Sequence, residues 1–64
     1  MTAQQIKEAT ATCVLNLVSL ADYLREAGFE EDGKQVAEAA MDVCGYGRFA
    51  FYSMREKETP ETEN

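Results

Sequence analysis

The sequence predicts an all-α protein, an antiparallel two-helix hairpin that self-associates into a four-helix-type dimer. Two heptad-spaced series of apolar residues, within residues 6–27 and 36–54, flank a short turn that has a glycine at each end. The segment 13–24, CVLNLVSLADYL, is apolar on more than one face, which exceeds what one partner helix can cover. A chain of 64 residues is also short for a self-sufficient core, so a second copy is the simplest source of further burial.

The chain divides into a helical hairpin domain over residues 1–56 and a charged tail over residues 57–64. From residue 56 the sequence reads EKETPETEN, which contains the only proline and has no large apolar side chain. Segments of this composition bury too little apolar surface to offset the entropy lost on ordering. We therefore expect residues 57–64 to form a disordered acidic tail.

Capping signals delimit the first helix. Thr2, followed three residues later by Gln5, fits a capping box, in which each side chain accepts from the other residue's backbone N–H. Gly28 suits the position just after a helix end, where a left-handed backbone is needed, and Phe29 suits the apolar position that follows. The first helix is therefore expected over about residues 3–27.

The turn, GFEEDG, leads into the second helix. Asp32 followed by Gln35 again resembles a capping box. Glu30, Glu31 and Asp32 also suit the positive N-terminus of a helix. We place the start of the second helix between Glu30 and Gly33.

The heptad positions of the two helices can be matched level by level. Large residues on the first helix then meet small residues on the second at several levels, which lets the backbones approach closely. The predicted facing pairs are Leu24 with Val36, Leu20 with Ala40, Leu17 with Val43, Cys13 with Gly47, Thr10 with Ala50, and Ile6 with Met54. This match predicts the register of the hairpin.

A second apolar stripe lies beside the first on the same helix. The hairpin contact accounts for one stripe and leaves the other without a partner inside the chain. We predict that this stripe forms the dimer interface, with Val14, Leu15, Val18 and Ala21.

Gly45 and Gly47 are the weak point of the second helix, because each glycine costs about 1 kcal/mol against alanine in a helix interior. Three interpretations are open. The helix kinks or breaks at Gly45 and a short third helix follows over 48–54, it continues and uses glycine for close packing, or RFAFY forms a strand because it is rich in β-formers. A lone strand needs a second strand, which the first helix does not offer. We favour a helix, straight or bent.

The chain lacks the side chains that catalysis or metal binding requires. It has no histidine, and a cysteine nucleophile needs an activating base. Cys13 and Cys44 fall near one level of the hairpin, and we interpret them as small buried side chains rather than a redox pair. Two cysteines cannot complete the four-ligand set of structural zinc. We therefore predict no enzymatic activity, no cofactor and no metal.

The charge balance excludes several partners. A net charge of −6 disfavours direct binding to nucleic acid and to anionic membrane surfaces. The sequence has no run of 18 apolar residues, and its first ten residues are polar and lack the apolar core of a signal peptide. We expect a cytoplasmic protein with reduced thiols and no membrane partner.

Two candidate binding surfaces stand out in the pattern. Tyrosine, phenylalanine and arginine, which are enriched at protein interfaces, cluster in the second helix. The predicted partner-binding residues there are Tyr46, Arg48, Phe49, Tyr52 and Arg55. The turn carries an acidic tip, formed by Glu26, Glu30, Glu31 and Asp32. An acidic tip can steer the protein toward a basic surface.

These features predict a small acidic helical protein that binds another protein and inhibits or modulates it. In size, charge and architecture it is similar to the small acidic helical inhibitors encoded by phages and mobile elements, which occupy dimerisation or DNA-binding surfaces of bacterial proteins. The likeness implies an inhibitor or anti-activator, for example of a DNA-binding regulator. Two alternatives are open: a nucleic-acid mimic that acts through the acidic tip, and a structural oligomerisation or adaptor subunit.

Overall fold

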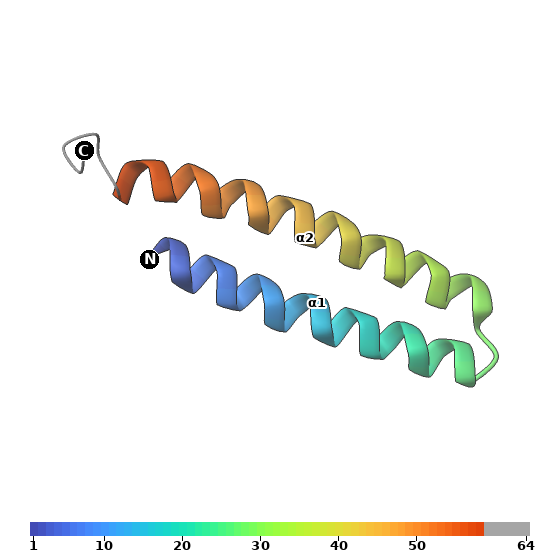
Figure 1. Ribbon diagram of the computed structural model, residues 1–64. Helices are drawn as coiled ribbons and strands as arrows, with labels where there is room; N and C mark the ends of the chain where they lie inside the picture. Colours follow the sequence, from blue (N-terminus) through green and yellow to red (C-terminus); the bar gives the residue numbers. More distant parts are fainter. Residues whose placement is uncertain (59–64) are drawn as a thin grey trace.

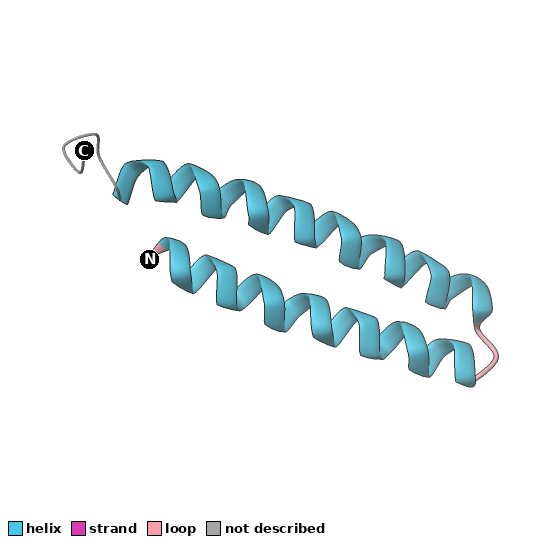
Figure 2. Ribbon diagram, in the orientation of Figure 1, coloured by secondary structure: helices cyan, strands magenta, loops and turns pink. Residues whose placement is uncertain are grey.

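The computed structural model describes residues 1–58, which form two antiparallel helices lying side by side (Figure 1). Helix α1 spans Ala3–Glu26 and helix α2 spans Glu30–Glu58, with a connection of three residues between them. No strand occurs within residues 1–58 (Figure 2). The all-helical, two-helix hairpin predicted from the sequence is confirmed.

The start of α1 is a complete capping box. The backbone N–H of Thr2 donates to Gln5 Oε1 at 2.8 Å, and the backbone N–H of Gln5 donates to Thr2 Oγ1 at 3.2 Å. Thr2 itself is extended, at φ −106° and ψ 164°. Each side chain therefore satisfies a backbone donor that the helix leaves without a partner.

The end of α1 is a Schellman motif centred on Gly28. Gly28 has φ +98°, a conformation that favours glycine. The N–H of Gly28 donates to the Arg25 carbonyl at 3.0 Å, and the N–H of Phe29 donates to the Leu24 carbonyl at 2.7 Å. The predicted roles of Gly28 and Phe29 are therefore confirmed.

Helix α2 begins at Glu30, at the early edge of the predicted interval. The Phe29 carbonyl accepts from the Gly33 N–H at 2.9 Å, so Phe29 precedes the first helical turn. Glu30, Glu31 and Asp32 all lie within that turn. The second capping box, predicted from Asp32, is therefore wrong because Asp32 is already helical.

Helix α2 is continuous through the segment where a kink, a short third helix or a strand was considered. It also includes Lys57 and Glu58, which we had assigned to the tail. The rest of the predicted tail, residues 59–64, lies outside the described residues.

The two glycines of this segment have different surroundings. A Cβ atom built on Gly45 would meet no atom within 4 Å, whereas one built on Gly47 would lie 2.6 Å from the Cβ of Thr10. Gly47 is therefore the point of close approach between the helices.

The contact between the helices is made by small side chains. Among the residues that the structure describes, the fully buried apolar ones are Ala3, Ala21 and Ala40, and no large side chain is fully buried. Half-buried residues complete the contact along both helices. They are Ile6, Thr10, Val14, Leu17 and Leu24 on α1, and Val36, Val43, Gly47, Ala50 and Met54 on α2. The six predicted contact positions on α2 are all buried or half-buried.

The predicted contact stripe of α1 needs correction. Cys13 is exposed and Leu20 is 45% exposed, although we had placed both between the helices. Val14 and Ala21 occupy those levels instead, and Ala21 is only 1% exposed. The helix is therefore rotated relative to the prediction, which brings Ala21 rather than Leu20 against α2.

The register also differs from the prediction. Gly47 lies against Thr10, whereas the predicted pairs placed Gly47 opposite Cys13 and Ala50 opposite Thr10. Gly33, near the turn, lies against Arg25 and the Ala21 carbonyl. Helix α2 is therefore displaced by about one turn from the predicted alignment.

The resulting molecule is a rod. Its radius of gyration is 15.5 Å, against about 10–11 Å for a compact domain of this length. Within residues 1–58 neither helix has the length and apolar character needed to cross a membrane. A rod of two helices with an alanine contact leaves most of its large apolar side chains at the surface.

Candidate functional site

An open groove of about 610 Å³ runs between the helices on one side of the hairpin, toward its open end. Its floor is formed by Thr10 and Gly47, where the helices approach most closely. The side chains along its walls are Lys7, Ala11, Val14 and Leu15 from α1, and Cys44, Arg48, Phe51 and Tyr52 from α2. The groove is therefore an apolar trough with basic residues near one end.

Phe51 organises the basic end of the groove. Lys7 Nζ lies 5.7 Å from the centroid of the Phe51 ring, and Arg55 Cζ lies 5.7 Å from the same centroid. Tyr52 meets Phe51 edge to face, with centroids 5.3 Å apart and an interplanar angle of 73°. Cations at this range are attracted to the ring face, so one aromatic side chain holds two positive charges at the groove end.

The apolar surface continues from the groove toward the turn. Val18 follows Val14 by four residues on α1, and Met41 precedes Cys44 by three residues on α2, so each neighbours a wall residue. Val18 is 43% exposed and Met41 is 74% exposed. Ala37 precedes Cys44 by seven residues and lies on the same side of α2. We use the name groove face for the groove walls together with Val18, Ala37 and Met41.

The predicted partner-binding residues do not form one patch. Arg48 and Tyr52 line the groove, and Arg55 stacks on its phenylalanine. Tyr46 and Phe49 do not line the groove and are each 76% exposed. Phe49 lies three residues from both Tyr46 and Tyr52, so it neighbours both on α2. The aromatic pair Tyr46 and Phe49 is therefore a second surface, outside the groove and next to its Tyr52 wall.

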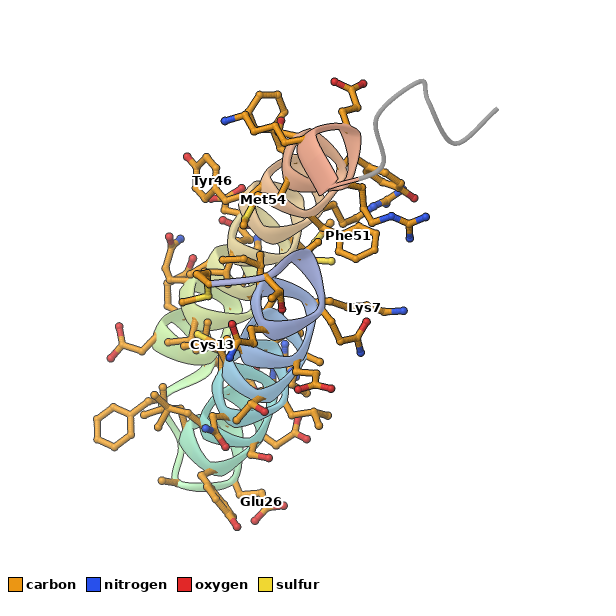
Figure 3. All side chains as sticks on the ribbon, turned by 90° about the vertical axis from the view of Figure 1, so that its left-hand side faces the viewer. Lys7, Cys13, Glu26, Tyr46, Phe51 and Met54 are labelled. Atoms are coloured by element: carbon orange, nitrogen blue, oxygen red, sulfur yellow. The ribbon has the colours of Figure 1, made fainter. Side chains whose placement is uncertain are left out.

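The side view shows how the two sides differ (Figure 3). Lys7 and Phe51 lie on one side of the hairpin, and Cys13 and Tyr46 lie on the other. Because each side carries exposed apolar groups, the hairpin can be covered on two sides at once.

The four predicted dimer residues do not all lie on one surface either. Val14 and Leu15 line the groove, and Val18 extends it toward the turn. Ala21 is buried against α2, so it cannot contact a second subunit, and this part of the predicted interface is wrong.

The two cysteines are free thiols in different surroundings. Cys44 is half-buried in the groove wall. Cys13 is exposed and lies in a shallow hollow along α1 with Ala9 and Asn16, away from the groove. Our interpretation of both as buried side chains is wrong for Cys13, because the rotation of α1 turns it outward.

The acidic tip is exposed along its whole length. Glu26 ends α1, while Glu30, Glu31 and Asp32 form the first turn of α2. The three carboxylates in the first turn of α2 stabilise the positive end of its helix dipole, so they have a structural role whether or not they bind a partner. Within residues 1–58 no cluster of three or more histidine, cysteine or carboxylate side chains is arranged to hold a metal ion.

Sequence reasoning left several members of the groove face without a surface, including Ala37 and Phe51. Lys7 and Ala11 were not assigned to a surface, although they precede Val14 and Leu15 at helical spacing. Met41 was also overlooked, although it lies three residues before Cys44. Tracing the second apolar stripe at spacings of three and four residues on both helices would have found them.

No protein-family model, no curated protein and no solved structure matches this chain.

Proposed function

We propose that this chain is a non-catalytic, dimeric protein that binds another protein and inhibits or modulates it. One observation carries the proposal: in the described part of the chain the buried core consists of three alanines, whereas ten large apolar side chains are 43–82% exposed. Exposed apolar surface of this extent on a small protein is typical of interaction sites. The proposed partner belongs to the bacterial regulators, including DNA-binding ones, whose dimerisation or DNA-binding surfaces are occupied by small acidic helical inhibitors.

The foreign partner is assigned to the surface formed by Tyr46 and Phe49. Both rings are 76% exposed and lie outside the groove. Aromatic side chains supply large contact area and dominate the binding energy of many interfaces. This leaves the groove face for self-association.

Replacing Phe49 with alanine is expected to weaken partner binding by about thirtyfold or more, because an interface anchor contributes about 2 kcal/mol or more. The measurement is affinity capture from bacterial lysate with quantitative mass spectrometry, followed by titration of the captured protein. The matched control is Tyr23→Ala, which removes an aromatic ring that is 68% exposed near the other end of the hairpin. Equal capture by the Phe49→Ala variant and the unaltered chain would rule out this surface.

The acidic tip supports one alternative, mimicry of nucleic acid. Three successive carboxylates, Glu30, Glu31 and Asp32, lie at the turn end of the rod. Replacing them with the matching amides removes charge and keeps shape. If mimicry is correct, this triple variant loses binding to a basic partner, and binding of the unaltered chain falls as salt rises from about 50 to about 300 mM, which shortens the Debye length by roughly half.

Salt-insensitive binding that survives the amide replacements would exclude mimicry. A stoichiometric complex whose partner keeps its full activity would instead identify a structural adaptor subunit. These outcomes separate the three functions with the same captured protein.

A further inference from the structure

We propose that the groove face is covered by the groove face of a second copy, with the two hairpins antiparallel, so that the turn of one lies over the open end of the other. The proposal rests on the dimeric state given above and adds which face is used and how the copies are oriented. It follows from the positions of apolar and charged residues along the rod.

The apolar part of the face on α1 matches itself when reversed. A two-fold axis that passes level with the midpoint between Val14 and Leu15 places Val14 opposite Leu15 of the second copy. The same axis places Ala11 opposite Val18. A self-complementary patch of this kind is what an isologous two-fold interface requires.

The face on α2 has the same centre. Met41 and Cys44 exchange places about a point between Asp42 and Val43. Thr10 and Gly47 are in contact, so they lie at the same height along the rod. The midpoint on α1 lies 4.5 residues after Thr10, and the midpoint on α2 lies 4.5 residues before Gly47, so in this antiparallel hairpin the two midpoints also lie at the same height. One axis therefore serves both helices.

Charged residues at the two ends of the face follow the same symmetry. On α1, Lys7 lies at one end and Asp22 at the other, and their midpoint is again between Val14 and Leu15. Asp22 follows Val18 by four residues, which places it on the same side of α1. Asp22 Oδ1 already accepts from Arg25 Nη1 at 3.4 Å, and the Asp22 side chain is still 62% exposed. In an antiparallel pair, Lys7 of each copy therefore faces the exposed carboxylate of Asp22 of the other.

Helix α2 repeats this arrangement with Arg55 and Glu30. Their midpoint lies between Asp42 and Val43, on the same axis. Arg55 stacks on Phe51 in the groove wall, and Glu30 precedes Ala37 by seven residues, so both lie on the groove side. The antiparallel pair thus brings four sets of opposite charges together at the edges of an apolar centre.

A parallel pair, with both turns at one end, does not have this complementarity. Stacking two groove faces that way places α1 of one copy over α2 of the other at the same level. Lys7 then lies near Arg48 of the second copy, and the basic ends repel each other. At the turn end of the same face, Arg25 and Lys34 balance Asp22 and Glu30, so the antiparallel pair avoids this repulsion between the basic ends.

The face is also large enough for a stable dimer. Helix α1 has 24 residues and spans about 36 Å. Two helices, each about 10 Å wide, present a face of about 700 Å². Standard protein interfaces bury about 800 Å² on each partner.

Reciprocal charge reversal tests the orientation. The substitution Lys7→Glu sets a carboxylate against Asp22 of the second copy, and Asp22→Lys sets an ammonium group against Lys7. Each variant alone is therefore expected to dimerise about tenfold more weakly than the unaltered chain, because two like-charge contacts replace two attractive ones.

In a dimer of one Lys7→Glu copy and one Asp22→Lys copy, both contacts join opposite charges. One is the original pair of Lys7 with Asp22, and the other is the pair of the two introduced residues. We expect the mixture to form a heterodimer with about the affinity of the unaltered chain. Sedimentation equilibrium at low salt, about 50 mM, measures the association where screening of these charges is weak.

The matched control is Asp42→Lys, which makes the same charge change on the other side of the hairpin, four residues before Tyr46. It should dimerise like the unaltered chain. A monomeric unaltered chain at tens of micromolar, or variants that show no preference for each other on mixing, overturns the proposal. Partner capture through Phe49 is measured separately, so failure here leaves the foreign binding site standing, and loss of that site leaves the dimer standing.

Discussion

Leu15→Asp is expected to convert the dimer into a monomer at micromolar concentration, with an increase of at least about 100-fold in the dissociation constant. Leu15 is 67% exposed in the single hairpin, so aspartate at this position stays hydrated there and does little harm to the fold. In the proposed dimer it lies beside the two-fold axis, where two aspartates would be brought together in an apolar centre. Burying unpaired charges costs several kcal/mol, which is more than most single contacts supply.

The control for this prediction is Asn16→Asp, the next residue along α1. Asn16 is exposed and lies with Cys13 in the hollow away from the groove, so the same new charge stays in water. Sedimentation equilibrium measures the association, and circular dichroism at low concentration checks that the helices persist. If Leu15→Asp dimerised with the affinity of Asn16→Asp, the groove face would not be the dimer interface.

The ends of the helices could be predicted from the sequence because local chemistry determines them. Thr2 with Gln5, and Gly28 with Phe29, have roles that depend on a few neighbouring residues, and both motifs have the predicted geometry. The second capping box failed because acidic residues suit both the cap and the first turn, and the pattern alone does not distinguish these positions.

The contact between the helices could not be predicted in the same way. Val14 follows Cys13 in the sequence, and Ala21 follows Leu20. The heptad pattern is therefore satisfied whichever residue of each pair faces α2. We had placed the larger leucine between the helices, whereas the structure buries the smaller alanine. Close approach of two backbones favours small side chains, and this preference only shows once both helices are placed together.

From the sequence we identified many of the exposed residues that are candidates for binding, but we did not predict which of them share one surface. Leu15, Tyr52 and Phe49 were all expected to bind other chains, yet the first two share the groove and the third does not. Which residues share a surface depends on the rotation and register of the helices. An error of one turn in the register therefore redistributes the residues among the surfaces.

Gly47→Ala is expected to lower the free energy of unfolding by about 1–3 kcal/mol, although alanine is the better helix former. The new Cβ would lie 2.6 Å from the Cβ of Thr10, which is fixed to the backbone and cannot rotate away. The helices must therefore separate, and the buried contacts of Ala21 and Ala40 loosen with them. Urea unfolding at one fixed protein concentration measures the effect.

Gly45→Ala makes the same chemical change two residues away and should act in the opposite direction. Its Cβ meets nothing within 4 Å, so the variant gains the helix propensity of alanine without a clash. An increase in unfolding free energy of about 0.5–1 kcal/mol is expected. If both variants were stabilised equally, the helices would not approach at Gly47. Opposite signs would show that this glycine sets the distance between the helices, and with it the depth and register of the groove above it.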